Sequence, residues 1–280
     1  NSMHFTRALR ADKKRPGLLY CGTEYGMYIS YDDGANWKTF QLNLPMVPIT
    51  DLTIKENDLI VATQGRSFWV LDDLSVVQQQ DNNIFNKNLH VFSVNDAYRF
   101  DGFQNPKPVN AGMNPPNGSV INYYVKDVSD SAKVSIDILD KNKKRIKTFS
   151  TKAKEKEDKI DVSSGMNQFV WDMKYPPAEK VDGQIIWHGN VPGPKAAPGQ
   201  YFYKIKAEKD SVEGSFTIKA NPVYNVSQQD YEEQFNFLIA IRDKFDEIQK
   251  AGKNIRDIRK QINDFMDKQG KDVTKEIKQK

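Results

Sequence analysis

Short runs of alternating hydrophobic and polar residues fill the first part of the chain, and they recur. When each residue is aligned with the one forty positions later, Leu19-Tyr20-Cys21-Gly22-Thr23 falls on Leu59-Ile60-Val61-Ala62-Thr63. The segment 28–33 falls in the same way on 68–73. Each copy predicts a strand, a short loop, a second strand and a pair of aspartates. A period of about 40 residues built of short strands is typical of β-propeller blades.

The same pattern places the strands of both repeats. The first repeat predicts four strands and the second three, at about 6–10, 18–23, 27–31, 37–42, 49–55, 58–63 and 68–71. The missing fourth strand of the second repeat is typical of a last blade that another part of the chain completes. A blade cannot bury both faces alone, so neighbouring blades have to stack. Two repeats cannot close a ring, and we expect further blades to precede them in a longer protein.

Beyond a linker rich in Gln and Asn at 75–87, strands separated by turn residues continue to about residue 221. The predicted strands are 91–94, 120–125, 134–139, 146–150, 167–172, 199–206 and 215–219. Asp140-Lys141-Asn142-Lys143 has the composition of a hairpin turn. The Pro- and Gly-rich segment 181–198 predicts a surface loop, because proline donates no backbone hydrogen bond. Seven strands in this length predict a β-sandwich of the immunoglobulin or fibronectin III type.

The spacing of apolar residues changes to three and four after Ser227, which with Asp230 three residues later predicts a helix start. Gly252 separates two apolar stripes and predicts a break, so the expectation is a helical hairpin. The stripes consist of Phe235, Leu238, Ile239, Arg242, Phe245 and Ile248, then Ile255, Ile258, Ile262 and Phe265. The whole chain is thus predicted to be mainly β, with two blades over 1–80, a sandwich over 81–222 and a helical hairpin over 223–280.

Composition narrows the classes of function. The net charge of +4, from 41 basic and 37 acidic residues, is too balanced for a nucleic-acid partner. No apolar run approaches the ~18 residues of a membrane span. One cysteine, Cys21, excludes an internal disulfide, and the three histidines share no metal-ligand spacing. We therefore expect no metal and no cofactor.

The most specific motif is Ser30-Tyr31-Asp32-Asp33-Gly34-Ala35-Asn36-Trp37, which spells the Asp-box S-x-D-x-G-x-x-W. Asp32 is expected to accept backbone N–H groups of its own turn, Gly34 to supply an unusual φ, and Trp37 to pack under the turn. Asp-boxes occur in sialidases, xyloglucanases and sortilin-type propellers. The motif therefore indicates an architecture and not an activity. Leu74 and Val77 replace the glycine and the tryptophan in the second repeat.

Two parts of the chain resemble known protein families. The run Asp58–Leu74, with Gln64-Gly65-Arg66-Ser67-Phe68-Trp69 at its centre, resembles the last blade of the sortilin-like BNR-repeat propellers of Bacteroidetes, which bear a glycosyl hydrolase label. Gly165–Asp172 and Ala197–Tyr201 resemble the Ig-like domain of flagellar hook-capping type. The resemblance implies a periplasmic or secreted protein whose signal peptide lies upstream. It transfers no catalytic motif.

The loops between the second and third strands of each repeat are the best candidates for a ligand site. They contain Glu24 and Tyr25 in the first repeat and Arg66 in the second. Glu24 could act as a general acid and Arg66 as an anion clamp, or both could be hydrogen-bond partners between blades. A glycosidase needs two carboxylates, and the position equivalent to Glu24 holds Gln64. Trp187, in the Pro- and Gly-rich loop, is a candidate for stacking on a ligand.

Three functions remain open at this point. The first is a non-catalytic interaction segment of an extracytoplasmic propeller protein, binding a glycan or a protein. The second is an accessory part of a glycoside hydrolase whose catalytic carboxylates lie in other blades. The third is a sortilin-like platform that binds peptides. Exposed blade faces also predict self-association or cover by another part of the chain.

Overall fold

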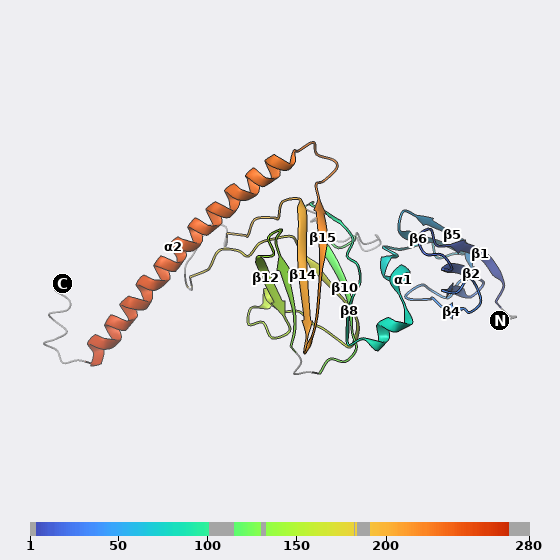
Figure 1. Cartoon of the computed structure of the whole chain (residues 1–280), viewed down its shortest axis with the longest axis horizontal. Coiled ribbons are helices and arrows are strands. Elements are labelled where there is room, and N and C mark those ends of the chain that lie inside the picture. Colours follow the sequence, from blue (N-terminus) through green and yellow to red (C-terminus); the bar gives the residue numbers. More distant parts are fainter. Residues whose placement is uncertain (1–3, 101–114, 130–132, 182, 184–190, 269–280) are drawn as a thin grey trace.

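A computed structural model of the chain describes residues 4–100, 115–129, 133–181, 183 and 191–268. Within these residues the protein is mainly β (Figure 1). A small β unit at the N-terminus is joined through a short helix to a β-sandwich, and one long helix follows the sandwich. The three parts lie in chain order along the molecule, with the helix projecting away from the sandwich (Figure 1).

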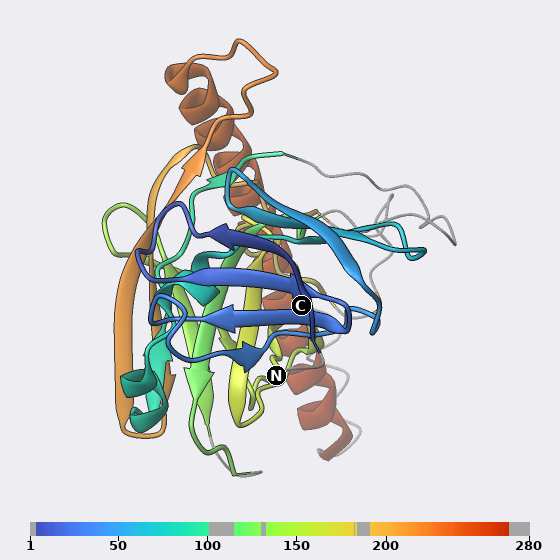
Figure 2. The same ribbon diagram turned by 90° about the vertical axis from the view of Figure 1, so that its right-hand side faces the viewer.

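The N-terminal β unit consists of two antiparallel sheets. The first has the order β1-β2-β3-β4, with strands Thr6–Ala11, Leu19–Thr23, Gly26–Ser30 and Lys38–Thr39. These four strands lie side by side in chain order in Figure 2. The second has the order β5-β6-β7, with strands Ile49–Lys55, Asp58–Thr63 and Phe68–Leu71. Strands β2 and β6 end forty residues apart, at Thr23 and Thr63, as the sequence repeat predicts.

The two sheets share one hydrophobic core. Gly22 of β2 lies against Ile49 of β5, and a Cβ at this glycine would sit 2.5 Å from the Ile49 Cγ2 atom. A side chain at position 22 would therefore push the sheets apart, so glycine sets their spacing. The buried members of the core are Ala8, Leu18, Tyr20, Met27, Ile29, Ile49, Leu52, Ile54, Leu59, Val61 and Leu74.

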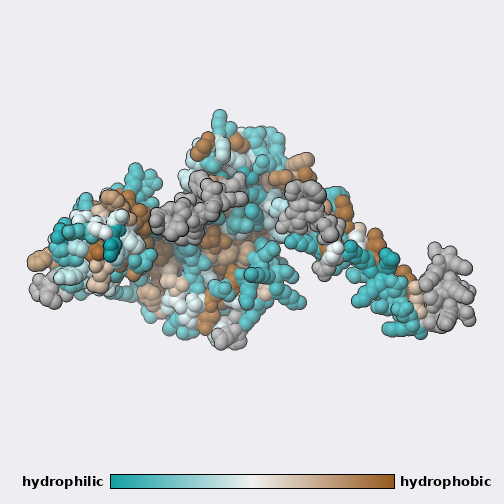
Figure 3. Space-filling view, turned by 180° about the vertical axis from the view of Figure 1, so that it is seen from behind, coloured by the Kyte–Doolittle hydropathy of each residue, from teal (hydrophilic) through white to brown (hydrophobic). Residues whose placement is uncertain are grey.

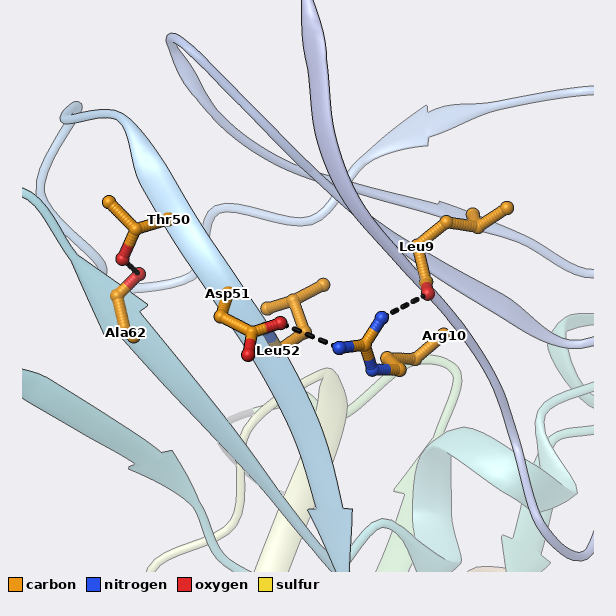
Figure 4. A network of polar contacts seen from close by, with 6 residues as sticks. All are labelled: Leu9, Arg10, Thr50, Asp51, Leu52 and Ala62. Carbon is orange, nitrogen blue, oxygen red and sulfur yellow. Dashed lines mark hydrogen bonds and ion pairs between the residues drawn. The ribbon is translucent and has the colours of Figure 1, made fainter.

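Polar contacts tie the first strands of the two sheets together (Figure 4). The guanidinium of Arg10 reaches from β1 to Asp51 on β5, with 2.7 Å between Nη2 and Oδ1. The same carboxylate oxygen accepts from the Leu52 N–H, and a second Arg10 nitrogen donates to the Leu9 carbonyl. Lys13 also donates to the Ile54 carbonyl on β5. The first strands of both repeats are thus neighbours, which is the relation that stacked repeats require.

The linker that the sequence predicts at 75–87 is more ordered than expected. It contains helix α1 (Ser75–Gln79) and a 3-10 turn, η1 (Asn82–Asn86). Arg15, from the loop after β1, donates to the carbonyls of Gln78 and Gln80 and lies over the Tyr31 ring at 4.8 Å. Polar side chains fix this segment to the first sheet, and neither composition nor periodicity reveals such distant contacts.

The sandwich is built of two sheets. The smaller has the order β13-β10-β8 and the larger the order β12-β11-β14-β15-β9. Every neighbouring pair is antiparallel except β15 and β9, which are parallel. The strands are β8 (Leu89–Val91), β9 (Ala97–Tyr98), β10 (Ser119–Val125), β11 (Val134–Leu139), β12 (Arg145–Ser150), β13 (Gly165–Trp171), β14 (Gly199–Ala207) and β15 (Asp210–Lys219).

One core fills the space between these sheets. Trp171 is completely buried, and its ring centroid lies 5.6 Å from that of Tyr201 and 5.9 Å from that of Phe216. The Tyr201 hydroxyl donates to the carbonyl of Ala197, four residues upstream, at 2.9 Å. The Asp140 carboxylate accepts from the N–H groups of Asn142 and Lys144, which closes the hairpin turn between β11 and β12. Strand β9 was not expected from the sequence, because two residues are too short for a pattern.

The predicted helical hairpin is wrong. A single helix, α2, runs from Gln228 to Lys268 and passes through Gly252 without a break. Glycine inside a helix costs only about 1 kcal/mol relative to alanine. Ion pairs on both sides of it, Lys250 with Asp246 at 2.6 Å and Lys253 with Glu179 at 3.0 Å, hold this part of the helix. The two apolar stripes therefore belong to one helix.

The sequence also predicts that the sandwich, the helix or a second chain covers the open faces of the blades. Among the described residues, the outer face of β7 stays open. Its Phe68 side chain is 76% exposed and its Val70 side chain is 53% exposed. Neither α2 nor the described part of the sandwich covers these side chains.

Candidate functional site

The turn between β2 and β3 presents two of the predicted site residues, Glu24 and Tyr25. The Thr23 hydroxyl donates to the Gly26 carbonyl at 3.0 Å and accepts from the Tyr25 N–H. Gly26 has a φ of 114°, and a Cβ there would lie 2.0 Å from the side chain of Gln41. Only glycine fits this conformation. The turn is therefore tightly defined, and it holds Glu24 and Tyr25 at the end of the sheet.

Glu24 forms an ion pair with Arg7 of β1. Its backbone N–H also donates to the Phe5 carbonyl at 3.2 Å, which brings the residues preceding β1 against the turn. The Arg7 and Glu24 side chains are 39% and 27% exposed. Glu24 therefore pairs with a residue of its own sheet. The alternative considered from the sequence, a hydrogen bond from Glu24 to a neighbouring blade, is not the contact observed.

Aromatic rings gather beside this ion pair. The His4 ring lies 4.9 Å from Tyr25 and 5.7 Å from Tyr28, and its Nδ1 atom is 2.6 Å from the Tyr28 hydroxyl. Phe5 and Tyr25 are largely exposed, at 70% and 52%. We call the six residues His4, Phe5, Arg7, Glu24, Tyr25 and Tyr28 the aromatic patch. Sequence reasoning found Glu24 and Tyr25 and missed the others, because they converge only when β1, β2 and β3 pair.

Arg66 is not part of this patch. It lies in the equivalent turn of the second sheet, between β6 and β7, and is exposed. Its carbonyl accepts from the Trp69 indole N–H at 2.9 Å, so its backbone supports the half-buried tryptophan below it. Glu24 pairs with Arg7 and not with Arg66. Trp187, the remaining predicted ligand contact, lies outside the described residues.

The Asp-box forms the turn between β3 and β4. One Asp32 carboxylate oxygen accepts from the Asn36 N–H at 2.8 Å and from the Ser30 hydroxyl at 2.8 Å, and the other accepts from the Asn36 side chain. The Ser30 hydroxyl in turn accepts from the Gly34 N–H. Hydrogen bonds, first those from Asn36, lower the pKa of Asp32. Both carboxylate oxygens of Asp32 accept hydrogen bonds from residues of the same turn, so Asp32 stabilises the turn.

The second repeat keeps the two aspartates of the box but leaves its backbone path at the next residue. Asp73 and Asp33 both have a φ of 57°, whereas φ is 91° at Gly34 and −71° at Leu74, where α1 begins. The Asp73 carboxylate accepts from Ser75 and Asn57, and Leu74, in place of Gly34, is completely buried. Burial, together with the neighbouring Asp58 and Asp73, raises the pKa of Asp72. A leucine that fills the core here replaces the glycine that the first box needs.

Trp37 is more exposed than the sequence predicts, at 39%, although its ring lies close to Gly34. We expect Trp37→Ala to lower the free energy of unfolding of the N-terminal unit by about 1–2 kcal/mol, well below the cost of removing a buried indole. Urea unfolding followed by circular dichroism measures this difference. Leu42→Ala, at a position that is 66% exposed, is the control for a surface truncation. A loss above ~3 kcal/mol would contradict the exposed placement.

The described residues contain little machinery for catalysis. They hold no group of three or more His, Cys, Asp or Glu side chains that could bind a metal ion. Burial raises the pKa of the Cys21 thiol, which disfavours its nucleophilic form. In the aromatic patch, Glu24 is the only carboxylate, whereas glycoside hydrolysis uses two. The patch combines exposed rings, a cation and hydrogen-bonding groups.

Comparison with known proteins gives no family. No family model matches the sequence, and no curated protein is significantly similar to it. One structure found by comparison is the extracellular domain described as that of a hybrid two-component system from B. thetaiotaomicron, with 10% identity and a TM-score of 0.22. The match covers 80% of this chain and 27% of that one, so this chain spans about a quarter of its length. A likeness at this level supports no argument about fold or function.

Proposed function

We propose that this chain is a non-catalytic binding segment of a larger extracytoplasmic propeller protein, and that the aromatic patch contacts its ligand, a glycan. The exposed Tyr25 ring beside the Arg7–Glu24 pair is the observation that carries this proposal. An aromatic face supplies apolar contact to a sugar ring, while the ion pair offers donors and acceptors to its hydroxyl groups. The patch has one carboxylate, which favours binding over hydrolysis.

The propeller assignment is supported by three features of the N-terminal unit. Its sheets are antiparallel meanders related by forty residues, their first strands β1 and β5 are neighbours, and the Asp-box lies between the third and fourth strands. In such a ring the turn after the second strand stands on the ligand-binding face. The aromatic patch lies at this turn in the first repeat.

The Ig-like assignment is supported by the strand order of the sandwich. Strands β8, β10 and β13 correspond to A, B and E of that fold, and β12, β11, β14 and β15 to C′, C, F and G. Tyr201 adds a second feature, because it lies near the start of the F strand and its hydroxyl bonds back to the Ala197 carbonyl. This contact resembles the tyrosine corner of Ig-like and fibronectin III domains and so supports the assignment.

We place the protein in the periplasm or outside the cell, following the family that its blades and its sandwich resemble. No helix among the described residues has the length and apolarity needed to span a membrane. Cell fractionation of the native organism, with an antibody against the sandwich, measures the location. Recovery of the protein in the cytoplasmic fraction would contradict this placement.

A glycan array probed with the purified chain tests the ligand, followed by titration of the best ligand. We expect Tyr25→Ala to weaken binding at least tenfold and Arg7→Ala to weaken it also. Tyr98→Ala is the matched control, because Tyr98 has the same 52% exposure but lies on β9 of the sandwich. Binding of extended peptides that depends on Tyr25 would instead assign the patch to a protein partner. Equal affinities of the Tyr25→Ala and wild-type proteins would exclude the patch.

A further inference from the structure

One face of α2 packs on the sandwich. Near the start of the helix, the guanidinium of Arg99 lies 5.0 Å from the Tyr231 ring centroid, and the Tyr175 and Phe235 rings are 4.8 Å apart. About three turns after Phe235, the Glu179 N–H donates to the Asp246 carboxylate at 2.8 Å. Loop residues from the sandwich thus cover this face of the first half of α2.

The opposite face carries an apolar seam that the described residues of this chain leave largely exposed. Its members repeat with the heptad spacing of three and four over four heptads, which is the pattern of a coiled coil. Its seven large apolar side chains are between 45% and 67% exposed. Hydrophobic residues recur along the projecting helix in Figure 3. The seam consists of Ile241, Ile248, Ile255 and Ile262 at the a positions and Phe237, Lys244, Ala251, Ile258 and Phe265 at the d positions.

The positions beside the seam are mostly uncharged. Between Leu238 and Gln261, the e and g positions hold two charged residues, Glu247 and Arg259. Lys244 occupies a d position. The other acidic and basic residues of this stretch lie at the b, c and f positions, away from the seam. Coiled coils that choose a different chain as partner usually encode that choice in charged e and g residues. A nearly neutral border fits a second copy of the same helix, because no like charges are forced together.

The residues of the seam favour an antiparallel pair of helices over a parallel one. In a parallel pair Lys244 would face Lys244 of the other copy, and Ala251 would face Ala251, which gives a like-charge contact and a gap. In an antiparallel pair centred on Lys253, Ile248 faces Ile258, Ala251 faces Ile255, and Lys244 faces Ile262. The Lys244 ammonium already pairs with Glu247 at 2.5 Å, outside the apolar contact. From Ile241 to Phe265, this antiparallel register therefore places at least one isoleucine or phenylalanine in every layer.

The size of the seam agrees with a stable dimer. The six large apolar side chains of the paired layers, each burying roughly 100 Å², give about 600 Å² per chain, or about 1,200 Å² in total, at the lower end of the range of specific interfaces. Most of the seam also faces away from the sandwich, since the packed residues lie on the other side of the helix. Ile241 is the exception, because it borders a pocket that it shares with the sandwich loop 191–195. Two copies can therefore meet along α2 with their sandwiches on the outside.

From these observations we propose that α2 forms an antiparallel two-stranded coiled coil with α2 of a second copy of this chain. The interface is the part of the seam from Ile241 to Phe265. The second copy thus fills the one long apolar surface of the helix. This self-association differs from the one expected on the open faces of the blades, because it leaves β7 free.

Light scattering coupled to size exclusion, over a concentration series, tests the dimer. The double variant Ile255→Ala with Ile262→Ala removes the centre of the seam while keeping the helix, because alanine has the highest helix propensity. We expect it to weaken dimerisation at least tenfold. The matched control is Asp257→Ala with Lys260→Ala, on the far side of the same stretch, which should leave the dimer unchanged. A wild-type monomer at all concentrations, or a dimer that survives the seam variant, would overturn the proposal.

Disulfide trapping tests the orientation, in a Cys21→Ala background that removes the native thiol. Ile248→Cys and Ile258→Cys are made in separate proteins. Each reduced protein is oxidised alone, and an equal mixture of the two reduced proteins is oxidised in parallel. The antiparallel register predicts cross-linked dimers in the mixture and none in either protein alone. Cross-linking of each variant with itself would show a parallel pair and refute the antiparallel assignment. Helical content measured by circular dichroism confirms that each variant is folded.

Discussion

Replacing Trp171 with alanine is expected to lower the free energy of unfolding of the sandwich by about 3–5 kcal/mol. The indole is completely buried between the two sheets, where it contacts the rings of Tyr201 and Phe216. Its N–H donates to the Lys174 carbonyl at 3.2 Å, and that acceptor would lose its partner. The loss therefore combines a cavity, missing ring contacts and an unsatisfied carbonyl.

Calorimetry of the purified chain measures this effect. Trp171→Phe keeps most of the ring contacts and loses the hydrogen bond, so an intermediate value is expected. The matched control is Tyr98→Ala, an exposed aromatic residue on the other sheet, which should change the stability by less than about 0.5 kcal/mol. A loss below ~1 kcal/mol in Trp171→Ala would contradict the packing of the sandwich core.

The second large effect concerns the spacing of the two N-terminal sheets. Gly22→Val should destabilise the N-terminal unit by about 1–3 kcal/mol, because the new side chain would overlap Ile49. Ile49→Ala alone should cost about 2–5 kcal/mol, because Ile49 is completely buried. Combining the two substitutions conserves the volume between the sheets. We therefore expect the double variant to be more stable than the sum of the single losses by about 1 kcal/mol or more.

A double-mutant cycle measured by urea unfolding gives this coupling. The control pair is Gly22→Val with Ile138→Ala, since Ile138 is buried in the core of the sandwich and does not contact Gly22. Those two losses should be additive. Additivity of Gly22→Val and Ile49→Ala would mean that β2 and β5 do not meet as described, and the stacked-repeat arrangement would fail with it.

Local sequence patterns predicted part of the candidate site and missed the rest. The hydrogen bonds of the Asp32 carboxylate were predictable because they join near neighbours in the sequence. The exposure of Trp37 and the bond from the Asp33 N–H to the Gly17 carbonyl were not. The aromatic patch was only partly predictable. Tyr25 and Glu24 stand out as turn residues, but nothing in the sequence near Arg7 indicates that its guanidinium reaches Glu24. That contact depends on the register of β1 on β2, which pairs Thr6 with Thr23.

The helix shows the reverse case, in which a local signal misled. Glycine at position 252 is a weak helix former, and the sequence alone favours a break there. Contacts with the sandwich, among them Glu179 with Lys253, stabilise the helix where its own propensity is lowest. Glu179 lies more than seventy residues before Lys253, so the sequence of the helix alone gives no sign of this contact.

The sequence by itself determined the positions of most strands, the forty-residue repeat, the Asp-box turn and the division between β and helical parts. These features depend on side-chain periodicity and on hydrogen bonds between near neighbours. The tertiary structure alone decided the continuity of α2, the fixed linker after β7, the exposure of Trp37 and the gathering of rings around Glu24. Each of these depends on contacts between segments far apart in the chain, whose energies outweigh the small local preferences that a sequence displays.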